Sequence, residues 1–221
     1  MKDLFTPLSR DERQDESVNK WLRNKGKSTV VAATGVGKTR IAIKCIQKVR
    51  TKYPNLNVLV LVPTELLKNQ WIEELDVWGL GFNTNVQVMM GASKREYTCD
   101  LLIIDEAHRI NSELIANVFK VVKYKLILGL TATFERLDGR HEILAKYAPV
   151  CDTITMEEAL LNGWVSKYKD FVVLVDVEDI DIYKKYNKEF VEHFEFFQYD
   201  FGKAMSELLL HILVIVCCKP L

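Results

Sequence analysis

The 221-residue chain carries 30 Lys and Arg against 30 Asp and Glu, and 48% of its residues are hydrophobic. Its length and hydrophobicity suffice for one full domain and part of a second. A formal net charge of zero excludes the strongly basic composition of a protein that binds nucleic acid through its overall charge. The charge is uneven, because residues 1–60 carry 13 Lys and Arg against 5 Asp and Glu. This asymmetry fits a basic face that meets phosphates and a solvated surface equally well.

Cysteine usage and the amino terminus favour a reduced, cytoplasmic protein. The five cysteines show neither CxxC spacing nor the density of a disulfide scaffold. Residues 1–16 contain no apolar stretch of the kind found in signal peptides, so secretion is not expected. The apolar run at residues 208–218 has about half of the roughly 20 residues that span a bilayer. It therefore predicts a buried element rather than a membrane anchor.

Short apolar runs alternate with amphipathic stretches from residue 28 onward, which is typical of an α/β fold. The pattern predicts a mostly parallel sheet with helices on both faces. We expect helices over residues 38–52 and 65–78, the second capped by Thr64. The apolar runs lack polar alternation, which favours central strands buried on both sides. The predicted strands comprise residues 28–32, 58–62, 86–90, 101–104 and 126–130.

The organisation of the sequence changes near residue 150, so we expect one domain over residues 1–150 and a second segment over residues 151–221. Residues 151–155, a short helix at 156–162 and the turn at Gly163 lead to an apolar strand at 171–177. Six aromatic residues at helical spacing then predict a long helix with one aromatic stripe. The stripe favours a packing face over a surface that stacks nucleic-acid bases. The six aromatic residues are Tyr183, Tyr186, Phe190, Phe194, Phe197 and Phe201.

The stretch AATGVGKT at residues 32–39 matches a phosphate-binding loop, with Ala32 where glycine is commoner. Its glycines let backbone amides close on phosphate oxygens, and the following helix directs its positive end to the same place. Lys38 would reach the β- and γ-phosphates, and the Thr39 hydroxyl would ligate Mg²⁺. The alternative is a glycine turn without a ligand. The predicted nucleotide-binding residues of the loop are Thr34, Gly35, Val36, Gly37, Lys38 and Thr39.

Two carboxylates, Asp105 and Glu106, follow the buried strand predicted at residues 101–104. A buried carboxylate pair is costly unless a cation or protons compensate it, and Mg²⁺ is the natural partner. Asp105 would hold the cation, directly or through water, while Glu106 orients and deprotonates the attacking water. Taken alone, the pair also fits a solvated strand end. Thr131 and Thr133 follow another strand, where they could sense the acidic pair or cap the next helix.

These stretches, taken together, resemble the motifs of superfamily 2 helicases and translocases. The resemblance is closest to the XPB-like branch and related phage DNA helicases, and it covers roughly residues 7–168. The segment from Arg136 to Tyr168 is also similar to the segment after motif III in that branch. The matches are Arg13 and Gln14 with the adenine-reading Q motif, residues 32–39 with motif I, residues 62–64 with Leu66 and Gln70 with motif Ia, residues 105–108 with motif II, and residues 131–133 with motif III.

The resemblance implies a RecA-like P-loop domain that binds ATP and Mg²⁺ and acts on nucleic acid, DNA rather than RNA. Contacts to the nucleic-acid backbone imply sequence-tolerant, salt-sensitive binding. The roles it implies are adenine contact for Gln14 with Arg13 nearby, nucleic-acid contact for Pro63 and Thr64, and coupling of hydrolysis to domain movement for His108, Thr131 and Thr133.

Two departures from the family pattern qualify these expectations. Residues 89–95 lack the threonine-containing signature of a second backbone contact. The chain also ends before a second RecA-like domain, whose arginines complete the ATP site and contribute about 10³–10⁵ in rate. Residues 206–221 fit an out-of-frame or prematurely stopped tail, or a strand whose partners lie in that missing domain.

The leading hypothesis is the amino-terminal ATPase domain of a DNA helicase or translocase, with weak activity on its own. One alternative is a non-motor module that binds nucleotide or DNA. Another is the motor part of a restriction or chromatin-remodelling system.

Overall fold

The computed structural model describes residues 8–106, 112–132, 142–165, 169–176 and 210–217. The chain forms two compact units, Met1–Trp164 and Val165–Leu221. The first unit therefore extends beyond the boundary that the sequence analysis placed at residue 150. The reason is strand β8 (Val150–Ile154), which pairs in parallel with β1 (Lys27–Ala32) and so belongs to the first unit.

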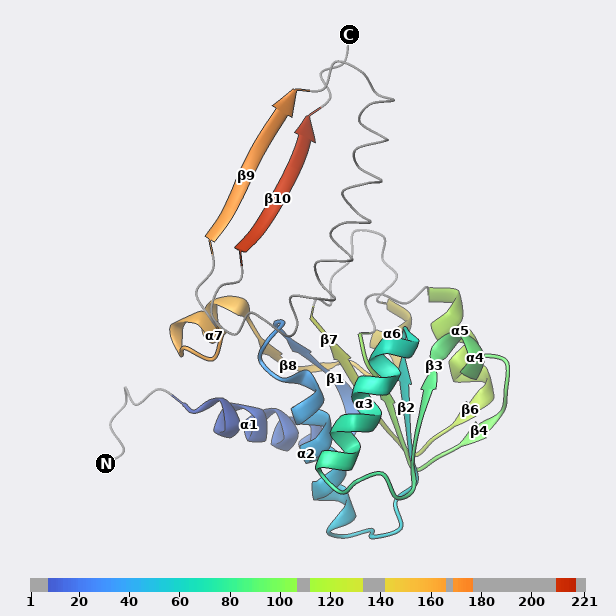
Figure 1. The fold of residues 1–221 in the computed structure, drawn as a ribbon. Helices are drawn as coiled ribbons and strands as arrows, with labels where there is room; N and C mark the ends of the chain where they lie inside the picture. Colours follow the sequence, from blue (N-terminus) through green and yellow to red (C-terminus); the bar gives the residue numbers. More distant parts are fainter. Residues whose placement is uncertain (1–7, 107–111, 133–141, 166–168, 177–209, 218–221) are drawn as a thin grey trace, which may run out of the picture. The chain divides into compact units, whose positions relative to one another are not determined.

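The first unit is built on one parallel six-stranded sheet with the order β3-β2-β5-β7-β1-β8 (Figure 1). Every residue of β2 and β5 is buried, as the unbroken Val, Ile and Leu runs predict for central strands. The predicted α/β class with a mostly parallel sheet is confirmed. The other strands of the sheet are β2 (Val58–Val62), β3 (Thr84–Val88), β5 (Leu101–Ile104) and β7 (Leu126–Thr131).

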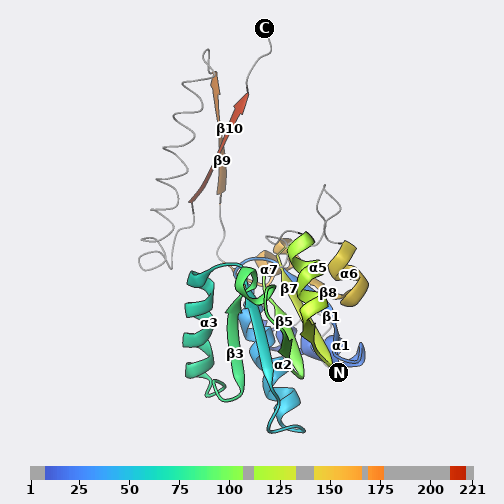
Figure 2. The ribbon, with the colours of Figure 1, turned by 90° about the vertical axis from the view of Figure 1, so that its right-hand side faces the viewer.

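Helices cover both faces of the sheet. From β1 the chain steps through β2 to the edge at β3, then reverses through β5 and β7 to β8. Since crossovers between parallel strands are right-handed, the reversal moves the connecting helices to the opposite face. Figure 2 shows α3 on one side of the sheet and α5 and α6 on the other. The helices are α1 (Arg10–Arg23), α2 (Lys38–Arg50), α3 (Glu65–Val77), α4 (Met89–Ala92), α5 (Ser112–Val121), α6 (Glu142–Tyr147) and α7 (Met156–Leu161).

The core has an apolar layer on each face of the sheet. Sheet residues such as Leu59 and Ile104 pack with Ile115 of α5 and Leu144 of α6 in one buried cluster. A short parallel pair, β4 (Tyr97–Thr98) with β6 (Val122–Lys123), lies beside the main sheet. The sequence predicts a strand over residues 86–90, but strand β3 ends at Val88. Met89 begins α4 instead, and its side chain belongs to this buried cluster.

Polar caps and one indole fix the helices on the other face. Ser9 and Glu12 form a reciprocal capping box at the start of α1. Trp21, at the other end of α1, is fully buried, and its Nε1–H donates to the Ile127 carbonyl oxygen of β7 at 2.9 Å. Thr64 caps α3 as predicted, because its side chain accepts a hydrogen bond from the Leu67 N–H.

In the second unit, β9 (Lys169–Asp176) pairs in parallel with β10 (Leu210–Cys217). These strands correspond to the strand predicted at residues 171–177 and to the apolar run at residues 208–218. The aromatic helix predicted between residues 183 and 201 lies outside the described residues. In the part of the chain that is described, none of the helices is long and apolar enough to cross a membrane.

Candidate nucleotide-binding site

The phosphate-loop sequence forms the connection between β1 and α2. Gly35 and Gly37 have φ angles of 87° and 92°, in the left-handed region that favours glycine. A Cβ on Gly37 would lie 2.7 Å from Nε2 of Gln14, so a larger residue there would displace the Gln14 side chain. Thr34 and Gly35 are exposed, whereas Val36 is fully buried and anchors the loop.

The amino-terminal end of α2 is open to an anion. Its N-cap is Gly37, which has no capping side chain, and no acidic residue occupies its first turn. The first N–H groups of a helix have no partners within the helix, and the helix dipole adds positive potential there. This end of α2, together with the backbone N–H groups of the loop, therefore suits a phosphate group.

Lys38 joins the phosphate loop to the acidic pair. Its Nζ lies 3.4 Å from Glu106 Oε1 and also donates to the Ala32 carbonyl oxygen at 3.4 Å. Both contacts are long for hydrogen bonds of a charged group, which are usually about 2.7–2.9 Å. Lys38 is therefore placed between the two motifs and loosely held, as suits a side chain that exchanges a carboxylate for a phosphate.

Asp105 is buried immediately after β5, and each of its carboxylate oxygens accepts one N–H. Oδ1 accepts the backbone N–H of Glu106 at 2.9 Å, and Oδ2 accepts Nε1–H of Trp71 at 2.7 Å. Burial raises the pKa of Asp105 above its ordinary value; the Trp71 hydrogen bond opposes this rise and the Glu106 charge adds to it. Glu106 itself has a left-handed φ of 49°, a strained conformation of the kind found at functional sites.

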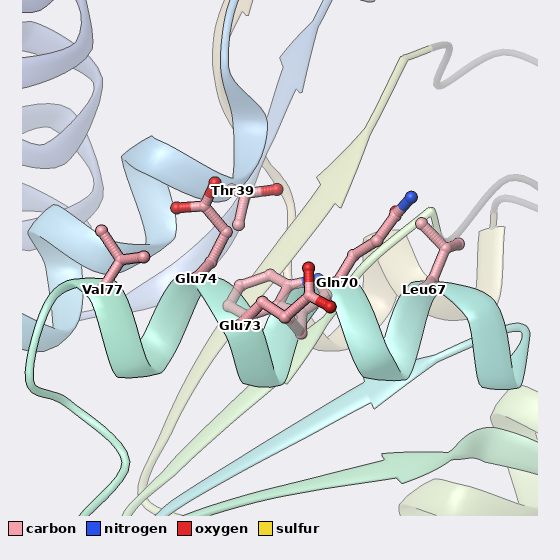
Figure 3. A pocket seen from close by; sticks show the side chains of 7 residues that line it. Thr39, Leu67, Gln70, Glu73, Glu74 and Val77 are labelled. Carbon is pink, nitrogen blue, oxygen red and sulfur yellow. The ribbon is translucent and has the colours of Figure 1, made fainter. Parts of the chain in front are cut away.

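Thr39 lies in the first turn of α2, directly after Lys38. It lines a pocket of about 350 Å³ together with Trp71, the residue that donates to Asp105 (Figure 3). In Figure 3, Thr39 lies across from Glu74 of α3. Oxygen ligands suit Mg²⁺, and a buried carboxylate with a raised pKa gains most from a cation. The residues present therefore fit Mg²⁺. The full lining comprises Thr39, Leu67, Gln70, Trp71, Glu73, Glu74 and Val77.

The two residues that resemble the Q motif point to different partners. Gln14 donates from Nε2 to the Val36 carbonyl oxygen at 2.8 Å, so it touches the phosphate loop directly. Arg13 instead uses all five of its N–H donors on protein acceptors, chiefly Asp152 at 2.6 Å and Glu158 at 2.6 Å. All its donors are thus engaged with the protein in this conformation, and its expected place near the adenine stays a prediction.

The remaining predicted residues occupy the same edge of the sheet or lie outside the described residues. Thr131 is buried at the end of β7, where its register partner Val31 precedes the phosphate loop. Pro63 and the exposed Thr64 connect β2 to α3. His108 and Thr133 belong to the part of the chain that the structure does not describe.

Two contacts at the site were missed by the sequence analysis. One is the Trp71 indole on Asp105, and the other is Arg10, whose Nη1 donates to the Gly35 carbonyl oxygen at 3.4 Å. Trp71 directly follows Gln70 of the stretch that resembles motif Ia. No sequence pattern indicates that its indole would reach another strand.

This geometry defines a P-loop nucleotide-binding domain with an acidic pair after β5, which β7 separates from β1 in the sheet. Residues 8–100 and 83–136 match the family described as "Type III restriction enzyme, res subunit". The chain belongs to this family and carries an amino-terminal domain of the superfamily 2 helicases, which confirms the resemblance of its motifs.

Curated relatives and solved structures agree with this assignment. The chain is 32% identical over 187 residues to DNA 3'-5' translocase XPB2 of Sulfurisphaera tokodaii, covering 74% of this chain and 40% of that protein. It is 28% identical over 198 residues to the putative ATP-dependent RNA helicase QP509L of African swine fever virus, covering 76% and 38%. The chain thus spans about two fifths of the length of these relatives.

The fold also resembles the Sulfolobus solfataricus SWI2/SNF2 ATPase core in complex with dsDNA. The TM-score is 0.57 at 15% identity, with 78% of this chain and 52% of that chain covered. This likeness supports the RecA-like fold, with the sheet and its helices arranged as in a helicase ATPase domain.

Proposed function

We propose that this chain is the ATP-binding part of an ATP-dependent DNA translocase or helicase. The observation that carries the proposal is the meeting of Lys38 and Glu106 at the carboxyl edge of the sheet, beside the open end of α2. Ligands of α/β sheets bind at this edge. The family membership and the relative named as a DNA translocase support the same function.

The chain's residues divide the chemistry among them. Lys38 and the loop N–H groups would bind the phosphates, and Gln14, whose Nε2 donates to the Val36 carbonyl oxygen of the loop, would contact the base. Glu106 orients the attacking water and takes its proton. Thr39 and Asp105 would hold Mg²⁺, which neutralises charge on the phosphates when it is bound. Thr131, His108 and Thr133 would couple ATP hydrolysis at the site to domain movement.

Nucleic acid would bind at Pro63 and Thr64, which connect β2 to α3. Thr64 is exposed, and the positive end of α3 begins there, so a backbone phosphate has both a hydroxyl and helix N–H groups nearby. We favour DNA because the relative with the higher identity is named a DNA translocase, while the viral relative is named a putative RNA helicase.

The function is tested by measuring nucleotide binding and ATP hydrolysis of the purified chain, with and without double-stranded DNA or RNA of matched length. We expect Mg²⁺-dependent ATP binding and slow hydrolysis that DNA stimulates more than RNA. Glu106→Gln should lower hydrolysis by about 10²–10⁴-fold and preserve binding, because it removes the base alone. Lys38→Ala should abolish binding.

Glu96→Gln serves as the control, because Glu96 is exposed and lies outside the site. It should leave both measurements unchanged. A rate of hydrolysis that is unchanged in the Glu106 variant would exclude the proposed base. ATP binding without any stimulation by nucleic acid would favour a non-motor binding module.

A further inference from the structure

Trp71 is a buried side chain that the proposed mechanism does not use. It lies on α3 with 1% of its surface exposed, and its Nε1–H donates to Oδ2 of Asp105 at 2.7 Å. The same side chain lines the pocket beside Thr39. One indole therefore contacts the carboxylate proposed to hold Mg²⁺ and borders the space next to the hydroxyl proposed to hold it.

A hydrogen bond of this kind restricts how the carboxylate can turn. The backbone N–H of Glu106 holds Oδ1, and the indole holds Oδ2, so rotation about the Asp105 side chain would break one bond or both. The indole N–H only donates, and it carries no charge. It thus orients the carboxylate without competing with a cation for it, which a lysine or arginine at this place would do.

Among the described residues, the hydrogen bond of the Trp71 indole differs in its acceptor from those of the other tryptophans. Trp21 donates to a backbone carbonyl oxygen of β7, far along the strand from its carboxyl end. Trp78 donates to Glu74 one turn away on the surface of the protein, and Trp164 donates to the Leu8 carbonyl oxygen. Only Trp71, among these, links α3 to a carboxylate at the site.

We propose that Trp71 is a positioning residue of the cation site, and that its indole N–H holds the Asp105 carboxylate in the orientation that binds Mg²⁺ with the nucleotide. This inference rests on the proposed ATP-binding function. Partners that orient metal ligands typically contribute 10–100-fold to metal affinity or activity. Trp71 touches neither the nucleotide nor the cation in this account, so its effect acts through Asp105 alone.

The test compares Trp71→Phe with Trp21→Phe as a matched control. Each change removes one indole N–H from a fully packed side chain and keeps an aromatic ring in its place. The quantity measured is the dissociation constant of ATP in Mg²⁺ and in EDTA, by calorimetry. Trp71→Phe should reduce the ratio of the dissociation constant in EDTA to that in Mg²⁺ by about 10–100-fold, and it should leave the dissociation constant in EDTA unchanged. Trp21→Phe should leave the ratio as in the unaltered protein.

A second measurement does not depend on the folding of the Trp71 variant. The protein has four tryptophans, so the indole N–H resonances of Trp21, Trp78 and Trp164 can each be assigned from its own Phe variant, which leaves Trp71. Addition of Mg²⁺ and nucleotide should shift the Trp71 resonance. An unmoved resonance, or equal Mg²⁺ ratios in the two Phe variants, would overturn the positioning role. Absence of ATP binding by the unaltered protein would instead overturn the proposed function.

Discussion

Two clusters of cations and carboxylates in the first unit are built in opposite ways. In the cluster that joins α1 to β8, the guanidinium of Arg13 contacts Asp152 and Glu158 at 2.6 Å, and all its donors are used. In the cluster between the phosphate loop and β5, Lys38 reaches Glu106 and a carbonyl oxygen only at 3.4 Å. The first cluster is saturated and holds the fold, whereas the second retains capacity for a ligand.

The difference arises from the geometry of the two cations. A guanidinium presents five donors in a rigid plane, and a buried one is stable only when its acceptors surround it. An ammonium on a long stem can exchange one partner for another. The saturated cluster therefore identifies the elements that must stay together, and the loose one lies at the proposed nucleotide site.

The largest expected effect comes from breaking the saturated cluster. Arg13→Ala would leave Asp152, whose side chain is 3% exposed, as a buried charge that has lost its main partner. Removing one partner of such a pair typically costs about 3–5 kcal/mol in the free energy of unfolding. Urea denaturation followed by circular dichroism measures this loss. Arg13→Lys, which keeps the charge, should lose less, and an alanine variant as stable as the unaltered protein would contradict the structural role of Arg13.

Acid should weaken the same cluster. Burial would raise the pKa of Asp152, but hydrogen bonds from Arg13, Lys20 and Ser17 outweigh it and lower the pKa from 3.8 to about 2. The stabilisation is present above the unfolded value and is lost as the pH falls through about 4 towards 2, by about 2 kcal/mol. Unfolding free energies measured between pH 6 and pH 2 test it. Asp152→Asn should flatten this part of the profile; an unchanged slope would exclude Asp152 as its source.

A smaller effect is expected at the start of α1, the helix that carries Arg13. The Ser9 side chain accepts the N–H of Glu12, and Ser9→Ala should cost about 1 kcal/mol. Ser9→Thr keeps the hydroxyl and should retain most of the stability. Chemical denaturation of both variants measures the difference, and equal losses would show that the capping hydrogen bond is not the cause.

Elements that are defined by their own local pattern are predictable from the sequence, whereas elements that depend on distant partners are not. Strands β2, β5 and β7 are recognisable because continuous apolar runs need no knowledge of their neighbours. Helix α1 was not predicted, because the side it buries includes Arg13, Gln14 and Ser17. Arg13 and Ser17 have their partner Asp152 in β8, far along the chain, and Gln14 has its partner in the phosphate loop. Strand β8 alternates buried and exposed residues at the sheet edge, which a search for buried runs does not detect.

The site divides in the same manner. Lys38, Asp105 and Glu106 are predictable from local motifs, since phosphate and cation chemistry requires particular residues at fixed spacing. The contact between Trp71 and Asp105 joins residues 34 positions apart, and no local pattern indicates it. Local chemistry is therefore predictable here, whereas the partners that orient it depend on how α3 packs on the sheet, against β2 and β3.

The smallest expected change in stability concerns Lys38, and it distinguishes the two clusters most sharply. Lys38→Met removes the cation but keeps an unbranched apolar stem of similar length. The two contacts it loses are both 3.4 Å long, and the Lys38 and Glu106 side chains are 9% and 19% exposed. The substitution also removes the desolvation cost of the Lys38 charge, which offsets the lost contacts. We therefore expect the free energy of unfolding to change by no more than about 0.5 kcal/mol, while ATP binding is lost. Denaturation measures the change in the free energy of unfolding, and calorimetry measures ATP binding. A loss of stability near that of Arg13→Ala would mean that Lys38 stabilises the fold rather than being available to bind a phosphate.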